Sequence, residues 1–294
     1  MTDLARRPGR STRRCARSLP VWPAVLLILA ATATGCSAGP NPTGAPPAYD
    51  HVVIVVEENH SAYQLVGAAY FNSLAARGAR FTHMYAITHP SQPNYVALFS
   101  GSTQGVTNDA VYSLSAPNLY DLLAASGHSF AGYSEDLPTA GFTGASSGLY
   151  VRKHAPWVSF ASVPASVNLP FTAFPSDYSQ LPTVSFVIPN LDNDMHDGTI
   201  AQADAWLAAN LNAYGYWAVS HNSLLIVTFD EPYDSEPAAT TPIATCLVGA
   251  GVIPGAVVQS DCTLYSILRL VEEIYRLPSL GSEAVAPQIR GPWG

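Results

Sequence analysis

The chain has 294 residues, of which 48% are hydrophobic and 12% are charged, which is enough for one large domain or two small ones. Residues 1–36 carry six arginines and one acid, so the formal net charge of −8 becomes −13 for the rest of the chain. So acidic a body repels nucleic acid and anionic membrane surfaces, and we expect no nucleic-acid partner.

The N-terminal region has the layout of an export signal. Its arginines precede Leu19, the apolar run VWPAVLLILAA follows near residues 21–31, and small residues lead to Cys36. The apolar run is short for a membrane-spanning helix. Ala33-Thr34-Gly35-Cys36 resembles a bacterial lipobox, in which the cysteine is lipidated. We therefore expect residues 1–36 to direct export, followed either by secretion or by anchoring through a lipid on Cys36.

Residues 37–49 are rich in Pro, Gly and Ala and predict a flexible tether, which leaves 50–294 as a single domain. Two cysteines, Cys246 and Cys262, lie in this domain. An oxidising compartment would permit a disulfide between them, but two buried thiols are equally compatible with the sequence. Their spacing is not that of a zinc site.

The stretch HVVIVVEENHS at 51–61 predicts a buried strand of a parallel sheet, because its run of β-branched residues is unbroken. Glu57, Glu58, Asn59 and His60 follow the run directly. Ligands of open parallel sheets bind beyond the carboxyl ends of the strands, so these side chains are candidates for a site. On its own, the stretch also fits a strand followed by a polar turn.

A helix is predicted for 69–78 and a short strand after it, before the proline-containing turn HPSQPNY at 89–95. We expect the prolines to prevent a helix there, so that Ser91 lies in a constrained loop and a helix begins near Tyr95. A serine in this position suits a nucleophile, whose developing charge a helix N-terminus stabilises. A capping serine is the alternative.

The next elements are a helix over 118–127 and a strand over 129–136 that ends in Glu135 and Asp136. Further on, RKHAPW at 152–157 combines two cations with His154. This segment is either a phosphate-contacting cluster or a solvated basic turn.

Two further strands end in acidic groups. The strand over 183–189 runs into NLDNDMHDGT, which contains His196 and precedes a long helix, and the strand within 223–232 ends in Asp230 and Glu231. The density of ligands in 190–199 favours a metal or phosphate site over an Asx-rich turn. If these strands run parallel to the one at 52–56, their acidic groups meet at one edge of the sheet. One more strand is predicted over 243–249 and a core-facing helix over 264–278.

Several of these stretches resemble the bacterial phosphoesterase family of acid phosphatases and phospholipases C, within the alkaline-phosphatase superfamily. They are HVVIVVEENHS, THPSQPNYVALFSGSTQGVT, YSEDLP, RKHAPWVSF, LPTVSFVIPNLDNDMHDGTIAQADAWL and NSLLIVTFDE. The resemblance covers about residues 50–280 and is strongest to secreted acid phosphatases that act on phosphatidylinositol 3-phosphate. It implies an α/β fold, a three-layer αβα sandwich with a mostly parallel central sheet.

The resemblance also implies a metal-centred site with a divalent ion as cofactor. The implied metal ligands are Glu58, Asn59, Ser91, Asp230 and Glu231. A hard cation held by such oxygens neutralises phosphoryl oxygens and lowers the pKa of a serine hydroxyl.

The resemblance further implies that Ser91 is the nucleophile and that His196 binds phosphate or protonates the leaving alcohol. His154, His89 and Asn94 fall in family motifs near the site and are candidates for catalysis or substrate binding. The implied activity is that of an acid phosphatase on phosphomonoesters, with lipid phosphates such as phosphoinositides among the candidate substrates. An enzyme that depends on a protonated imidazole works best below neutral pH.

Two departures from the family pattern fall near the implied site. Pro232 follows Glu231 where the family has a third acid, and Leu264 stands where it has a histidine. Asp234 or Glu236 could replace the missing acid. Two other functions therefore stay open at this stage: a phospholipase C-type phosphodiesterase, and a catalytically degenerate surface-anchored protein that binds phosphorylated ligands.

Overall fold

The computed structural model describes residues 44–294, apart from the side chains of residues 283 and 284, and these residues belong to one compact unit. The predicted export signal and residues 37–43 of the predicted tether lie outside the described residues. Tyr49 is buried, its hydroxyl donates to Ala250 O at 2.7 Å, and its ring lies 6.4 Å from that of Trp293. The contacts of the domain therefore extend to Tyr49, the last residue of the predicted tether.

A sheet of eight strands forms the centre of the described domain. Its spatial order is β11 (Ala256–Val258), β2 (Ala79–Phe81), β10 (Cys246–Gly249), β9 (Ser223–Phe229), β1 (His51–Glu57), β8 (Val184–Ile188), β4 (Phe130–Ser134) and β7 (Asn168–Pro170). Two small ladders join β3 (Met84–Tyr85) to β12 (Cys262–Thr263) and β5 (Ser146–Ser147) to β6 (Tyr150–Val151).

The strands β9, β1, β8, β4 and β7 run parallel, whereas β10 is antiparallel to β9 and β2. Val52 to Val56 are at most 1% exposed, as expected for a strand with helices on both faces. Glu57 lies opposite Phe229 in the β1–β9 register, so the residues that follow both strands emerge together.

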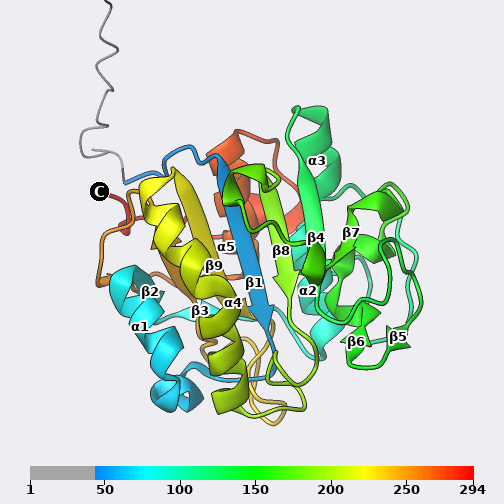
Figure 1. The fold of residues 1–294 in the computed structure, drawn as a ribbon, viewed down its shortest axis with the longest axis horizontal. Helices are drawn as coiled ribbons and strands as arrows, with labels where there is room; N and C mark the ends of the chain where they lie inside the picture. The colour runs from blue at the N-terminus through cyan, green and yellow to red at the C-terminus, as the bar shows by residue number, and fades with distance from the viewer. Residues whose placement is uncertain (1–43) are drawn as a thin grey trace, which may run out of the picture. The chain divides into compact units, whose positions relative to one another are not determined.

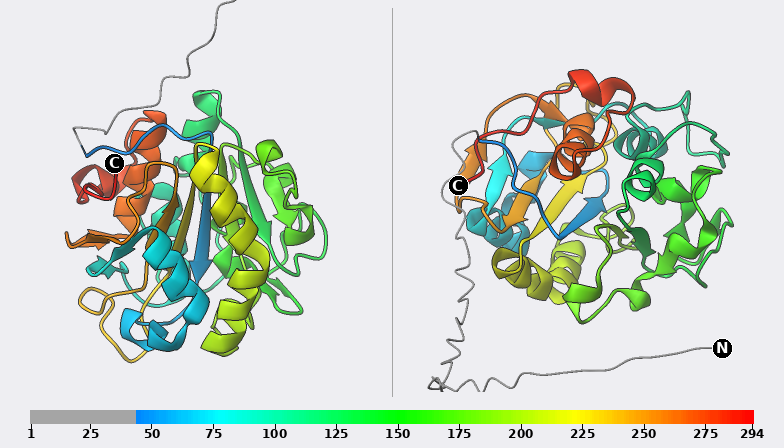
Figure 2. Two further views of the ribbon diagram at one scale, coloured as in Figure 1. Left: turned by 60° about the vertical axis from the view of Figure 1, so that its left-hand side comes forward. Right: turned by 90° about the horizontal axis from the view of Figure 1, so that it is seen from above.

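The helices are α1 (Ala69–Arg77), α2 (Ser91–Ser100), α3 (Leu119–Ala125), α4 (Ile200–Ser220) and α5 (Leu264–Tyr275). Short 3-10 helices are η1 (Ala62–Gly67), η2 (Arg152–His154), η3 (Pro156–Ser159), η4 (Ala165–Val167), η5 (Phe171–Ala173), η6 (Tyr178–Gln180) and η7 (Gly281–Val285). Helices α1 and α4 cover one face of the sheet, and α2 and α5 cover the other (Figures 1 and 2). This arrangement confirms the predicted three-layer αβα fold with a mostly parallel sheet.

Local capping fixes the ends of the predicted helices. Asn118 Oδ1 accepts from Asp121 N at 3.3 Å and Asp121 Oδ2 accepts from Asn118 N at 3.2 Å, which forms a reciprocal cap on α3. Thr199 Oγ1 accepts from Gln202 N at 3.2 Å at the start of α4. The predicted helices over 118–127 and after 199 are therefore present.

Helix α2 begins at Ser91, not near Tyr95 as predicted. Pro90 is the N-cap residue and Pro93 lies in the first turn, where backbone N–H groups have no partner within the helix. The prolines therefore start the helix where we expected them to prevent it. As a result, Ser91 is the first residue of a ten-residue helix.

Cys246 and Cys262 are both free and buried. Of the two alternatives left by the sequence, the structure therefore has unpaired thiols. Within residues 44–294, no helix combines the length and the apolar character needed to cross a membrane.

Candidate active site

The carboxyl ends of β1 and β9 bring the predicted acidic groups together. Asp230 N donates to Glu57 O at 2.9 Å, and Asn59 N donates to Asp230 Oδ1 at 3.1 Å. Asn59 has a φ of +54°, a left-handed conformation that asparagine tolerates better than most residues. The convergence expected from parallel strands is thus present, because β1 and β9 are neighbours in register.

Ser91 reaches this cluster from the start of α2. Its Oγ donates to Glu58 Oε2 at 3.0 Å and lies 3.5 Å from Glu231 Oε1. All three residues are at most 2% exposed. The structure therefore brings together the five residues predicted as metal ligands: Glu58, Asn59, Ser91, Asp230 and Glu231.

These residues fit a divalent cation. Asn59 Oδ1 and Asp230 Oδ2 are buried and have no hydrogen-bond partner among the described residues. Buried polar oxygens are normally paired, so two unpaired ones beside further carboxylates favour a ligand between them. Carboxylate, amide and hydroxyl oxygens are the donors that hard divalent ions prefer.

The buried acidic side chains destabilise one another's ionised forms. Burial raises the pKa of Asp230 and Glu231 well above the usual range, and the neighbouring Glu58 raises both further. Burial likewise raises the pKa of Glu57, and Asp194 and Glu58 add to that shift. A bound cation would let these groups ionise, which is a second reason why the donor set fits one.

A second donor set shares Glu58. One atom each from Glu58, His154 and His196 lies within 4.8 Å of the others. His154, however, is only 1% exposed and is not among the residues that line the cavity described below. Asn59, Ser91 and Glu231 of the oxygen-rich set line it, whereas His196 is the one member of the second set that does. The oxygen-rich set is therefore the better candidate for a cation next to Ser91.

His154 lies behind Glu58 and has no access to the cavity. Its Nε2 lies 3.1 Å from Glu58 Oε1, its Nδ1 lies 3.2 Å from Asp194 Oδ2, and its ring stacks on Tyr95 with centroids 5.1 Å apart. Burial lowers the pKa of His154 to about 4. The predicted direct contact of His154 with substrate is therefore not supported by its position. Its ring packs beside Glu58, whose Oε1 accepts from the Tyr95 hydroxyl at 2.5 Å.

Asn94 also differs from its predicted role in substrate binding. Its Oδ1 accepts from Ile87 N and Thr88 N, and its Nδ2 donates to Thr88 O and to Glu231 Oε2. The side chain is fully buried, and these bonds use its polar groups. Asn94 therefore holds the turn before α2 and orients Glu231.

The cavity above this cluster has a volume of about 180 Å³. It is lined by Asn59, His89, Pro90, Ser91, Asp109, Lys153, His196, Glu231 and Asp234. The predicted residues His89 and His196 thus lie in its wall. His89 Nδ1 lies 3.0 Å from Glu231 Oε2, and its Nε2 lies 2.8 Å from Glu236 O.

His196 belongs to the loop that follows β8. Its Nδ1 lies 2.7 Å from Asp197 Oδ1 and its Nε2 lies 3.2 Å from Lys153 Nζ, so the carboxylate favours a proton on Nδ1 and the ammonium donates to Nε2. The loop is closed tightly, since a Cβ on Gly198 would lie 1.8 Å from Asp192 O. Asp194 Oδ1 accepts from His196 N at 2.8 Å and fixes the start of this turn.

Sequence reasoning missed three residues at the site. Asp109 follows α2 in a loop without a recognisable pattern, and its Oδ1 accepts from Gln92 N at 3.0 Å. Lys153 was one of two cations in RKHAPW, and its Nζ lies 3.0 Å from Asp109 Oδ2. Asp194 was one of several acids in 190–199. The composition of RKHAPW and of residues 190–199 indicated that these segments belong to a site, but only the fold shows which of their residues lie there.

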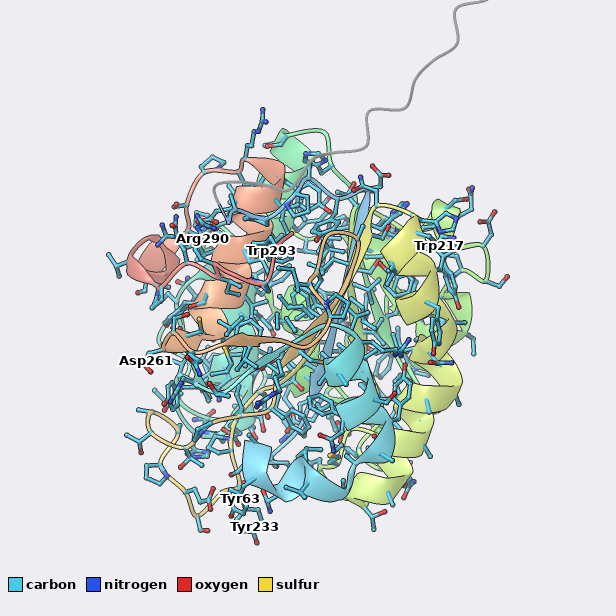
Figure 3. All side chains as sticks on the ribbon, turned by 90° about the vertical axis from the view of Figure 1, so that its left-hand side faces the viewer. Tyr63, Trp217, Tyr233, Asp261, Arg290 and Trp293 are labelled. Carbon is cyan, nitrogen blue, oxygen red and sulfur yellow. The ribbon has the colours of Figure 1, made fainter. Side chains whose placement is uncertain are left out.

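The two residues suggested as replacements for the family's third acid lie in different surroundings. Asp234 lines the cavity, whereas the Glu236 carboxylate accepts from Ser61 Oγ and from the Tyr63 hydroxyl at 2.6 Å. Tyr63 and Tyr233 lie beside each other on the surface there (Figure 3). Leu264 is fully buried in the hydrophobic core and does not line the cavity.

Comparisons with known proteins agree with this architecture. A profile of the Phosphoesterase family matches residues 62–278. Phosphatidylinositol-3-phosphatase of Mycobacterium tuberculosis is 47% identical over 283 residues, which cover 92% of this chain and 93% of that protein. Phosphate-repressible acid phosphatase of Penicillium chrysogenum is 34% identical, over 86% of this chain and 66% of that protein.

Among solved structures, a protein of the alkaline phosphatase superfamily from Vibrio parahaemolyticus superposes with a TM-score of 0.52 at 13% identity, covering 83% of this chain and 71% of that one. This likeness supports the fold. The names of the two relatives confirm the predicted enzyme class, a hydrolase of phosphomonoesters. The length of the matched region and the identity to both relatives show that the chain belongs to the phosphoesterase family.

Proposed function

We propose that this protein is an exported acid phosphatase that uses Ser91 as its nucleophile and cleaves phosphomonoesters, phosphoinositides among them. The observation that carries the proposal is the position of Ser91. It begins a helix, lines the cavity, and directs its hydroxyl at Glu58 Oε2 3.0 Å away. The named activity of the relative that is 47% identical supports a phosphoinositide as one substrate.

We infer the following course of reaction. Ser91 Oγ attacks phosphorus and gives its proton to the Glu58 carboxylate 3.0 Å away, while the bond from phosphorus to the leaving alcohol oxygen breaks. This step forms a phosphoserine and releases the alcohol. The N-terminus of α2 favours the negative charge of the phosphoryl group beside it. His196, when protonated, donates to the leaving oxygen, and water then cleaves the phosphoserine.

A divalent cation held by Glu58, Asn59, Ser91, Asp230 and Glu231 would supply positive charge to the phosphoryl oxygens and lower the pKa of the serine hydroxyl. The unpaired Asn59 Oδ1 and Asp230 Oδ2 support this part of the proposal. Export, with secretion or a lipid on Cys36, is supported by the N-terminal sequence.

The test is an assay of the purified protein with p-nitrophenyl phosphate between pH 4 and pH 8, alongside the diester bis(p-nitrophenyl) phosphate. We expect turnover of the monoester with an optimum below pH 7. Preferential turnover of the diester would favour a phospholipase C-type enzyme, and no turnover of either would favour a degenerate binding protein. After acid quenching, mass spectrometry should find phosphate on the peptide that contains Ser91.

A further inference from the structure

Lys153 is the single lysine among all 294 residues, and its side chain lies in the wall of the cavity. It is also the one basic residue, histidines aside, among the residues that line the cavity within the described part of the chain. The neighbouring Arg152 does not share this position, because its guanidinium donates to the backbone carbonyls of Thr143, Tyr112 and Val158. The only lysine of an acidic protein is thus placed where the phosphoryl group would bind.

Two contacts hold the ammonium group in place. Nζ lies 3.0 Å from Asp109 Oδ2 and 3.2 Å from His196 Nε2. Asp109 is itself fixed to the first turn of α2, since its Oδ1 accepts from Gln92 N. An ammonium group has three N–H donors, so one has no protein partner among the described residues. The side chain is 19% exposed, which leaves that donor accessible from the cavity.

The charges around the cavity make this lysine important for an anionic substrate. Asp109 and Asp234 in the lining repel phosphate, whereas Lys153 attracts it. A phosphomonoester carries a second negative charge near neutral pH that a phosphodiester lacks. An ammonium group fixed beside the phosphoryl oxygens therefore interacts more strongly with the monoester.

We propose that Lys153, positioned by Asp109, binds the non-bridging phosphoryl oxygens and makes the site selective for phosphomonoesters over phosphodiesters. This inference rests on the proposed function. Binding of phosphate between Lys153 and His196 would replace their present contact, and it would bring His196 Nε2 next to the substrate. Lys153 is then a specificity-determining residue, and Asp109 is a positioning residue.

The kinetic test compares p-nitrophenyl phosphate with bis(p-nitrophenyl) phosphate, which share a leaving group. In Lys153→Met we expect kcat/KM for the monoester to fall about 10²- to 10³-fold, which is the usual effect of losing one hydrogen-bond donor to a reacting oxyanion. The kcat/KM for the diester should change less than about threefold. Lys153→Arg should recover at least a tenth of the preference for the monoester that Lys153→Met loses. Asp109→Asn keeps an acceptor for Gln92 N and should lose part of the wild-type preference for the monoester.

Arg80→Gln is the matched control, because it removes one positive charge from an exposed position on β2. It should leave the ratio of the two activities unchanged. Circular dichroism and thermal unfolding of each variant show whether the fold is retained.

Binding can be followed without turnover. Trinitrobenzenesulfonate modifies amines, and peptide mapping separates Lys153 from the N-terminal amine. We expect inorganic phosphate to protect Lys153 in the wild type and in Ser91→Ala.

The kinetic comparison and the protection experiment together separate this inference from the proposed function. If the wild type hydrolyses neither ester, the proposed function is wrong, and protection by phosphate still decides whether Lys153 binds it. If the wild type is active but Lys153→Met keeps the same preference for monoesters, Lys153 does not determine specificity. Inhibition by phosphate without protection of Lys153 also overturns the inference.

Discussion

Ser91 Oγ lies 3.0 Å from Glu58 Oε2, and this contact joins the first residue of α2 to the residue that follows β1. The two elements pack from different layers of the domain, so the distance depends on the whole αβα arrangement. Glu58 Oε1 accepts in turn from the Tyr95 hydroxyl, so each oxygen of this carboxylate has a hydrogen bond that orients it.

Replacement of the nucleophile is the first prediction. Ser91→Ala should lower kcat for p-nitrophenyl phosphate by about 10³-fold or more, because Ser91 is the one residue with a hydroxyl that lines the cavity within residues 44–294. Its melting temperature should stay close to that of the wild type, since the lost hydrogen bond contributes only about 1 kcal/mol. Ser102→Ala, beyond the end of α2, is the control and should retain full activity. Wild-type turnover by Ser91→Ala would exclude the proposed nucleophile.

Removal of divalent ions is the second prediction. Dialysis against a chelator should abolish activity and lower the melting temperature, because the acids around Asp230 then face one another uncompensated. Addition of single divalent ions should restore both, and elemental analysis of the native protein identifies the ion. Asp230→Asn should weaken binding of that ion about 10-fold or more in calorimetry. Full activity and unchanged stability after chelation would contradict a metal site.

Asp234 and Glu236 should behave differently when each is replaced. Asp234 lines the cavity, so Asp234→Ala should weaken ion or substrate binding and raise KM. The Glu236 carboxylate binds Ser61 and Tyr63, and these bonds lower its pKa. Glu236→Ala should therefore leave the affinity for the ion unchanged. It should speed hydrogen exchange of the backbone amides in 232–242, because the hydrogen bonds of Glu236 to Ser61 and Tyr63 hold this segment in place. The opposite pattern would mean that Glu236 is the replacement for the family's third acid.

The sequence predicted which segments build the site better than it predicted what each residue does there. The ends of β1 and β9 were predictable, since several unbroken apolar runs end in acids and the carboxyl ends of parallel strands meet at one edge of a sheet. Asn94 and His154 were not, because membership of a motif does not distinguish a side chain that lines the cavity from one buried behind it. The start of α2 was mispredicted because the first turn of a helix accepts proline. Asp109 reaches Lys153 only through the tertiary fold.

The two thiols supply the fourth prediction. Burial raises the pKa of Cys246 to about 12 and also raises that of Cys262, so neither forms a reactive thiolate near neutral pH. A thiol reagent such as dithiobis(nitrobenzoate) should leave both unmodified in the native protein and modify both in denaturant without a reductant. A disulfide formed after export would instead keep these two cysteines unmodified in denaturant until a reductant is added.

The stability of the metal-free protein should fall as the pH rises. Burial raises the pKa of Asp194 from 3.8 to about 7. The folded protein therefore binds this proton more tightly than the unfolded chain does, so the contribution to stability is complete below pH 3.8 and is lost as the pH rises through 7. Asp230 and Glu231 shift in the same direction.

Between pH 5 and pH 7.5 we expect the melting temperature of the metal-free protein to fall by several degrees, on a scale of about 2–4 °C per kcal/mol for a domain of this size. Asp194→Asn should reduce the slope, since an amide keeps the acceptor for His196 N but does not ionise. Asp177→Asn, an exposed acid that caps η6, is the control and should not change it. A divalent ion in the buffer should oppose the fall, because a cation favours the ionised carboxylates of its ligands. A melting temperature that rises over this range, with the same slope in Asp194→Asn, would show that Asp194 ionises normally in the folded protein.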